Sequence, residues 1–334
     1  MRKAFFLFFL ILIFFLSCDN KEETLYTIGV FQFNDAPTLN IARKAFQNAL
    51  EENGFFDGRN IRIIFKNGGE DIPEVQRIAQ DFVSQRVDMI VAFSTSCLQS
   101  AINATQKIPI VFSNVANPYL AGAGQSKDVH LSNVSGVSSR GPIKQGIAFI
   151  KEVLPGVKRI GTLWTPSELN SEFYLEVVRT SARELGLEII AVPITNSSEV
   201  ILSTQALINR KIDVLFPVSD NTINASFEAL GQIAEENTIP LFGGFLLSVN
   251  MGACAAVGWD FYDMGYKAGE IAIRIKNGEN PKSISFQEMN RVRIYLNLNY
   301  AKKQGIEFSE DSLKKAYKII EPESNLDSIK LPYY

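Results

Sequence analysis

Short apolar segments alternate with longer amphipathic segments along almost the whole chain. Such alternation is typical of βαβ units, in which each strand is followed by a helix. Most of the short segments are apolar at every position, as expected for parallel strands that helices cover on both faces. The expected strands are residues 26–32, 61–66, 89–93, 110–112, 159–164, 188–193, 214–218, 241–242 and 254–257.

The segments between these strands have apolar residues at helical spacing. Residues 39–52 place Ile41, Ala45 and Ala49 on one face and end at Asn53-Gly54, where the glycine is a common helix stop. Equivalent helices are expected at residues 75–85, 142–153, 171–185, 200–209, 223–237 and 261–276.

The order of strands and helices in residues 26–112 returns in residues 159–242. The fold class predicted from this repeat is α/β, with two Rossmann-like lobes, each doubly wound around a parallel sheet. A length of 334 residues agrees with about two domains. Ligands bind such sheets at the carboxyl ends of their strands. The function is therefore expected in the loops that follow the strands, which are rich in Ser, Thr, Asn and Gly: residues 32–37, 94–99, 114–118, 165–171, 196–198, 219–222 and 243–248.

Polar residues in these loops have two possible roles. Ser94-Thr95-Ser96 opens an expected helix, where it would either bind a ligand carboxylate or only cap the first turn. Asp220 follows an apolar strand directly. We interpret it as the partner of a ligand ammonium group, with capping of the next helix as the alternative.

The N-terminus has the pattern of an export signal. Arg2 and Lys3 precede an unbroken apolar run over residues 4–16, whose helical length of about 20 Å is short for a membrane span of about 30 Å. Residues 1–17 are therefore predicted to be a signal peptide. Leu16-Ser17-Cys18 resembles a bacterial lipobox, so Cys18 is expected to carry lipid and residues 18–25 to form a tether. The alternative is that Cys18 merely follows an ordinary cleavage site.

Motifs for common chemistries are missing from the sequence. It has one histidine, His130, no G-x-S-x-G motif and no phosphate-binding loop. Cys97 and Cys254 lie in apolar surroundings, which suggests buried free thiols, with one disulfide as the alternative. The expectation is a protein with no metal, no cofactor and no enzymatic activity, although carboxylate-only chemistry stays open. A net charge of -3 without a Lys/Arg block argues against nucleic acid as a partner.

Four stretches of the sequence resemble a known family. They are residues 133–138, 158–171, 217–222 and 258–265. In these stretches the chain is similar to the substrate-binding lipoproteins of ABC transporters whose characterised members include tryptophan- and tyrosine-binding components. The resemblance implies a type I periplasmic-binding-protein fold, in which a hinge of three crossings joins the two lobes.

Lobe boundaries follow from placing these crossings near residues 131–136, 245–252 and 277–285. Lobe 1 is then expected to comprise residues 26–134 and 252–280, and lobe 2 residues 135–251 and 281–300. Residues 301–334 are expected to contain a helix near 311–319 and a tail, and are assigned to neither lobe.

The resemblance also implies a set of ligand neighbours at matching positions. These are Gln32, Thr95, Ser96, Asn114, Pro166, Asn170, Asp220 and Asn221. The chain departs from its relatives at Gly243-Gly244-Phe245, where they often have an acidic or polar residue, so Phe245 is expected to add an aromatic wall. Other aromatic candidates are Phe33, Trp164 and Trp259, for which a place in the core is the alternative.

The function expected from the resemblance is a receptor for a small solute. It would be exported to the cell envelope, held on the membrane by the Cys18 lipid alone, monomeric, and would deliver an aromatic or apolar amino acid to ABC permease subunits. A sensory ectodomain, a receptor for a nucleoside or sugar, and an envelope enzyme are the alternatives.

Overall fold

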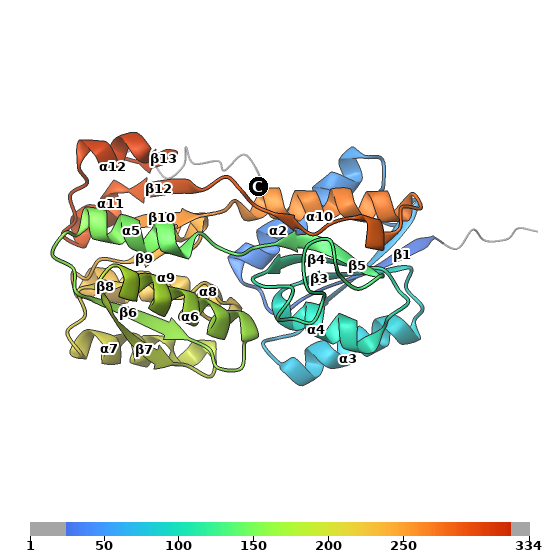
Figure 1. The fold of residues 1–334 in the computed structure, drawn as a ribbon, viewed down its shortest axis with the longest axis horizontal. Helices are drawn as coiled ribbons and strands as arrows, with labels where there is room; N and C mark the ends of the chain where they lie inside the picture. The colour runs from blue at the N-terminus through green and yellow to red at the C-terminus, as the bar shows by residue number, and fades with distance from the viewer. Residues whose placement is uncertain (1–24, 322–334) are drawn as a thin grey trace, which may run out of the picture.

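The computed structural model describes residues 25–321, so the predicted signal peptide, Cys18 and most of the predicted tether lie outside the described residues. Figure 1 shows two lobes side by side, joined along one edge by extended segments. Each lobe combines β-sheet with covering helices, and each has its own hydrophobic core. The predicted two-lobed α/β architecture is therefore confirmed.

Lobe 1 is built on a six-stranded sheet in the order β11-β5-β4-β3-β1-β2, in which every pair of neighbours is parallel. Helices α2 and α10 cover one face, and α3 and α4 cover the other (Figure 1). The elements are β1 (Tyr26–Gln32), α2 (Pro37–Glu52), β2 (Ile61–Asn67), α3 (Ile72–Ser84), β3 (Met89–Phe93), α4 (Thr95–Ala104), β4 (Ile110–Val115), β5 (Val134–Ser138), α10 (Phe261–Lys276), η3 (Pro281–Ser283) and β11 (Gln287–Glu288).

Lobe 2 contains a three-stranded sheet, β7-β6-β8, and a four-stranded sheet, β13-β12-β10-β9. A parallel bridge between Leu215 and Leu241 connects the two. The elements are α5 (Ile143–Val153), β6 (Arg159–Trp164), α6 (Leu169–Glu184), β7 (Glu188–Pro193), η1 (Ser197–Glu199), α7 (Val200–Asn209), β8 (Val214–Leu215), α8 (Asn221–Ala225), α9 (Phe227–Glu236), β9 (Phe242–Gly243), η2 (Leu246–Asn250), β10 (Ala255–Gly258), β12 (Arg293–Asn297), α11 (Leu298–Lys303), α12 (Glu310–Lys315) and β13 (Lys318–Ile320).

The chain crosses between the lobes at residues 139–142, 259–260 and 289–292, later in each case than predicted. The strand β5 pairs with β4 in lobe 1, whereas the prediction placed residues 135–138 in lobe 2. A β-carbon on Gly136 would lie 2.3 Å from the carbonyl oxygen of Phe112, so the glycine that interrupts the apolar pattern of β5 is needed for this pairing.

Two further boundaries differ from the prediction. The strand β10 pairs with β9 and β12 in lobe 2, so the chain returns to lobe 1 only at α10. Beyond Arg293 the described chain belongs to lobe 2, because β13 pairs with β12 and Phe308 joins the lobe 2 core. The helix expected at residues 311–319 ends at Lys315, and its last part is the strand β13.

Both cysteines of the described chain are free and buried, Cys97 in the core of lobe 1 and Cys254 in the core of lobe 2. Burial raises the pKa of each thiol to about 12. Neither is therefore a reactive thiolate near neutral pH.

The close packing of α10 against α2 predicts that a larger residue at the contact lowers the stability of the fold. A β-carbon on Gly265 would lie 1.9 Å from the carbonyl oxygen of Ala42, so Gly265→Ala must push the two helices apart. We expect this substitution to lower the free energy of unfolding by about 1–3 kcal/mol, measured by urea denaturation. Gly156→Ala is the control, because no atom lies within 4 Å of its added carbon. Equal unfolding midpoints for the two variants would contradict the close packing.

Candidate ligand-binding site

A pocket lies between the lobes, at the carboxyl ends of strands from both sheets. It spans about 290 Å³ including its opening to solvent. Only about 20 Å³ of this space can take the centre of a water-sized sphere, which is room for about one water molecule, so a larger ligand requires the lobes to part. Its lining residues are Thr38, Leu39, Asn114, Ala116, Ser139, Asn170, Tyr174, Ser219, Asn221, Asn224 and Phe261.

The lobe 2 side of this pocket is organised by the fully buried carboxylate of Glu168, which lies just before α6. Asn170 Nδ2 donates to Glu168 Oε2 at 3.0 Å, and Asn221 donates to the same oxygen through its backbone and its side chain. Thr222 donates to Glu168 Oε1 from its backbone nitrogen at 3.0 Å and from its hydroxyl at 2.7 Å. One carboxylate thus fixes the start of α8 and two pocket amides. Glu168 was not predicted as a site residue.

Two amide oxygens of the pocket residues are buried without a hydrogen-bond partner among the described residues. They are Asn170 Oδ1 and Asn224 Oδ1. The amide nitrogens are already engaged, that of Asn170 by Glu168 and that of Asn224 by Ser219 Oγ at 3.1 Å. Because buried polar atoms in native proteins nearly always have partners, these two acceptors indicate a site for hydrogen-bond donors of a ligand.

Asp220 lies behind the pocket and not on its wall. Its carboxylate accepts from Ser171 Oγ and from the backbone nitrogen of Ile223, both at 2.7 Å, and caps α8. Burial and the nearby Glu168 carboxylate raise the pKa of Asp220 well above its usual range. The geometry thus matches the capping alternative weighed from the sequence, and the ammonium contact expected for Asp220 has no place in this arrangement.

Three of the predicted ligand neighbours line the pocket: Asn114, Asn170 and Asn221. Asn114 has a left-handed backbone, with φ of 58°, and its Nδ2 donates to the carbonyl oxygen of Thr38 at 3.0 Å. The end of β4 is thereby tied to the start of α2, two elements that both contribute pocket residues.

The other predicted neighbours are not among the lining residues of the described pocket. Gln32 is buried and bonds Asn34, Asn40 and Arg43 within lobe 1. Thr95 and Ser96 are buried in the first turn of α4, and Pro166 is exposed.

Aromatic walls of the pocket come from Tyr174 and Phe261, which the sequence analysis did not select. Phe245 packs edge-on against Phe227 in the lobe 2 core, with ring centroids 5.0 Å apart. The aromatic wall expected from Phe245 is therefore wrong.

Of the other aromatic candidates, Phe33 and Trp259 belong to the core of lobe 1, and Trp164 packs against that of lobe 2. The helical spacing of residues 171–185 predicted the helix that carries Tyr174. Nothing in that pattern indicated that Tyr174 lines the pocket.

The lobes also touch directly, and one of these contacts involves the pocket residue Asn221. Asn34 Nδ2 in lobe 1 donates to the carbonyl oxygen of Asn221 in lobe 2 at 2.9 Å. Ser197 Oγ in lobe 2 donates to Glu70 Oε2 in lobe 1 at 3.1 Å. The structure is accordingly in a closed arrangement.

Residues 27–320 match the family model described as ABC transporter substrate binding protein. The chain belongs to this family. A relative named tyrosine-binding protein, from Clostridioides difficile, is 36% identical over 297 residues, covering 89% of this chain and 85% of the relative. The substrate-binding role in ABC transport predicted from the sequence is thus confirmed, and so is the two-lobed fold. Binding proteins of this family are extracytoplasmic.

Two similar solved structures, one with bound ligand and one ligand-free and open, allow the lobe arrangement to be compared. An ABC domain from Streptococcus pneumoniae in complex with L-Trp is 26% identical, with a TM-score of 0.84 and coverage of 89% of this chain and 100% of that one. A ligand-free, open structure of a Clostridium difficile substrate-binding protein is 34% identical, with a TM-score of 0.65 and coverage of 89% and 99%. The chain resembles the ligand-bound structure more closely although its sequence is nearer to the open one, in agreement with the closed arrangement.

No helix within residues 25–321 is long and apolar enough to cross a membrane. The same residues contain no group of three or more His, Cys, Asp or Glu side chains that could hold a metal ion.

The buried Asp220 predicts a pH dependence of stability. Its pKa is raised by folding, so its contribution to stability is complete below the unfolded value of about 3.9 and is lost as the pH rises toward the folded value. Asp220→Asn keeps the cap oxygen but does not ionise. We expect the melting temperature of the variant, relative to the native chain, to increase as the pH rises above about 4 and to level off once the pH exceeds the folded pKa. A difference that does not change with pH would contradict the raised pKa.

Proposed function

We propose that the pocket between the lobes binds an amino acid with an aromatic or apolar side chain and that the protein delivers it to an ABC permease. The observation that carries the proposal is the pair of unpartnered acceptors, Asn170 Oδ1 and Asn224 Oδ1, in a pocket that also has the rings of Tyr174 and Phe261. An ammonium group supplies three donors and no acceptor, so it suits such oxygens. The names of two relatives, which mention tyrosine and L-Trp, support the same ligand class.

The remaining pocket residues suggest where the carboxylate and the side chain of the ligand lie. Thr38 lies in the first turn of α2, a helix of 16 residues whose amino end favours negative charge. We assign the ligand carboxylate to this position, beside the Thr38 hydroxyl. The side chain then lies against Tyr174 and Phe261, where apolar area is buried when the lobes close.

Closing of the lobes, and not bond making, is the proposed mechanism. The closed pocket is too small to admit an amino acid from solvent. Binding therefore begins with the lobes apart, and closure brings the lobe 1 residues onto a ligand that already contacts lobe 2. An empty closed form that is too stable would compete with binding, because only the open form can take up ligand.

The place of the protein in the cell is proposed from its N-terminus. Residues 1–17 serve as a signal peptide, and Cys18 carries the lipid that holds a monomeric receptor at the membrane surface. The same fold and site would also serve a sensory ectodomain. Its partner would then be a signalling protein and not a permease.

A ligand screen tests the proposed ligand class. We expect L-tyrosine, L-tryptophan or another amino acid with an apolar side chain to raise the melting temperature of the chain from Asp19 onward, which retains every described residue. A ligand at 100 times its Kd adds about 2.7 kcal/mol to the stability, enough to detect. A shift given only by a nucleoside or a sugar would refute the amino-acid assignment.

The two unpartnered amide oxygens give a prediction about affinity. Asn170→Ala and Asn224→Ala each remove one acceptor from the pocket, and each should weaken amino-acid binding by about 1.5–3 kcal/mol, or roughly 10- to 150-fold, because the lost partner faces a charged group. The measurement is isothermal titration calorimetry with the amino acid found in the screen. Asn209→Ala, at the exposed end of α7, is the matched control. Unchanged affinity in both pocket variants would contradict the assignment of the ligand ammonium group to these two oxygens.

A further inference from the structure

The turn that joins β2 to α3 carries a carboxylate to a contact between the lobes. Glu70 lies in this turn with a left-handed backbone, φ 66°, directly after Gly69 with φ 62°. Two successive left-handed residues make a sharp turn, and such a backbone is unfavourable for glutamate. Strain of this kind persists where the surrounding structure holds it, and it often marks a functional position.

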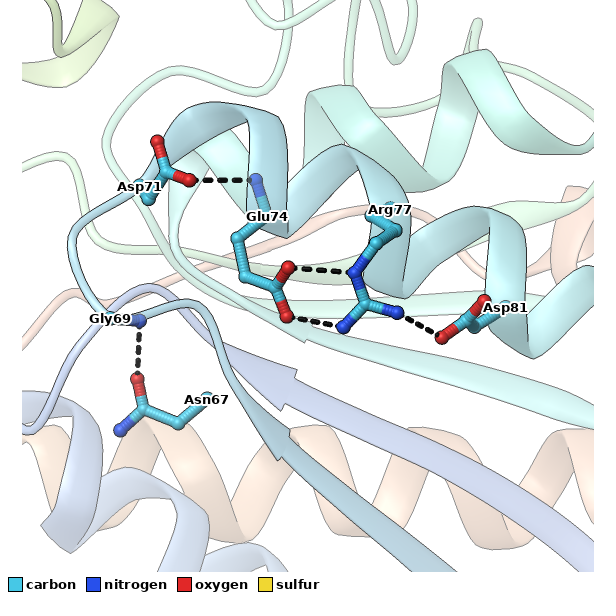
Figure 2. Close-up of polar contacts among 6 residues, drawn as sticks. All are labelled: Asn67, Gly69, Asp71, Glu74, Arg77 and Asp81. Carbon is cyan, nitrogen blue, oxygen red and sulfur yellow. Dashed lines mark hydrogen bonds and ion pairs between the residues drawn. The ribbon is translucent and has the colours of Figure 1, made fainter.

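Bonds on both sides hold this turn (Figure 2). Asn67 Oδ1 accepts from the backbone nitrogen of Gly69 at 2.9 Å, and Asp71 caps α3 by accepting from that of Glu74 at 3.3 Å. The backbone nitrogen of Glu70 itself donates to the carbonyl oxygen of Phe33 at 3.1 Å. Glu70 is therefore presented by a pinned turn whose position does not depend on the other lobe.

Each oxygen of the Glu70 carboxylate has its own partner. Oε1 accepts from Asn34 Nδ2 at 3.0 Å, within lobe 1, and Oε2 accepts from Ser197 Oγ at 3.1 Å, from lobe 2. Asn34 Nδ2 also donates to the carbonyl oxygen of Asn221, a pocket residue of lobe 2. Glu70 thus makes one contact between the lobes directly and orients the side chain that makes another.

The partner in lobe 2 is also fixed before the lobes meet. Ser197 begins the short helix η1, where Asn196 Oδ1 accepts from the backbone nitrogen of Ser198 at 3.0 Å. Glu199 closes the same loop by accepting from the backbone nitrogen of Thr195 at 2.8 Å and from its hydroxyl at 2.7 Å. Two preformed surfaces therefore meet on closure, and little ordering is required to make the contact.

From this geometry we infer that Glu70, Asn34 and Ser197 form a latch that stabilises the closed form and sets how long a ligand stays bound. None of Glu70, Asn34 and Ser197 is among the residues that line the described pocket. They act as positioning residues, through the orientation of the lobes. The inference rests on the proposed function for its ligand, but the latch itself is a property of the chain.

Three variants isolate the latch. Glu70→Ala removes both carboxylate contacts. Glu70→Gln keeps them, because its amide oxygen accepts from Asn34 and its amide nitrogen donates to the Ser197 hydroxyl. The matched control is Glu74→Ala, the same substitution four residues later, where the side chain pairs with Arg77 within α3 (Figure 2).

The experiment measures lobe closure and ligand release separately. Dyes on Lys107→Cys in lobe 1 and Arg210→Cys in lobe 2, both exposed positions, report the distance between the lobes by single-molecule energy transfer. The two native cysteines of the described chain are buried and leave these sites to be labelled selectively. Each variant is measured without ligand and with L-tyrosine or L-tryptophan, and the dissociation rate of the amino acid is followed by stopped flow.

We expect Glu70→Ala to reduce the ratio of closed to open molecules about tenfold and to raise the dissociation rate by a similar factor, with little change in the association rate. Glu70→Gln and Glu74→Ala should behave as the native chain. The latch is overturned if Glu70→Ala leaves both the closed population and the dissociation rate unchanged, or if Glu74→Ala changes them equally. It is also overturned if the native chain has no closed population with or without amino acid.

The same experiment distinguishes failure of the ligand assignment from failure of the latch. If neither amino acid binds, the energy transfer of the ligand-free protein still compares Glu70→Ala with Glu74→Ala. A shift confined to Glu70→Ala would then support the latch while the proposed function fails. Normal amino-acid binding by all variants with identical rates would support the function while the latch fails.

Discussion

The buried carboxylate of Glu168 is the interaction on which the lobe 2 half of the cleft depends. An isolated buried carboxylate is very unfavourable, and here five hydrogen-bond donors surround it. Those donors lie at the starts of α6 and α8, which follow β6 and β8. The requirement to satisfy one charge therefore joins two segments that are distant in sequence. The amide oxygen of Asn170 is left for the pocket because its nitrogen is bound by Glu168, and that of Asn224 because its nitrogen is bound by Ser219. Part of the ligand chemistry of the site thus follows from a charge that the ligand does not touch.

The lobe 1 half depends on different chemistry. Asn114 and Asn34 have side chains that bond backbone carbonyls, one in α2 and one across the cleft in lobe 2. Asn114 lies at the end of β4 and Asn34 in the loop after β1, two strands of the same parallel sheet. Lobe 2 therefore contributes acceptors oriented from behind, and lobe 1 contributes Asn34, whose bond to Asn221 exists only after closure. This division suits a receptor that must first capture a ligand and then enclose it.

The sequence predicted the periodic part of the structure well, because burial on both faces leaves a clear apolar pattern. The ranges of β3, β6, β7, α7 and α10 agree with those expected from that pattern. Strand β5 was missed because two serines and Gly136 interrupt its apolar residues, although every residue of it is buried. Chain crossings depend on which sheet a strand joins, and this is decided by partners distant in sequence that local pattern does not report.

Within the site, loops were predictable and side-chain roles were not. Asp220 and Glu168 are both acidic residues after strands of lobe 2, and nothing local shows that both face a helix start and not the pocket. The result matters physically, because a carboxylate in direct contact would hold an ammonium more tightly than neutral amides do. A receptor must also release its ligand to a permease. Neutral acceptors, one of them held by a buried carboxylate, give selectivity for a cationic group, and they leave the final affinity to be set by the closure of the lobes.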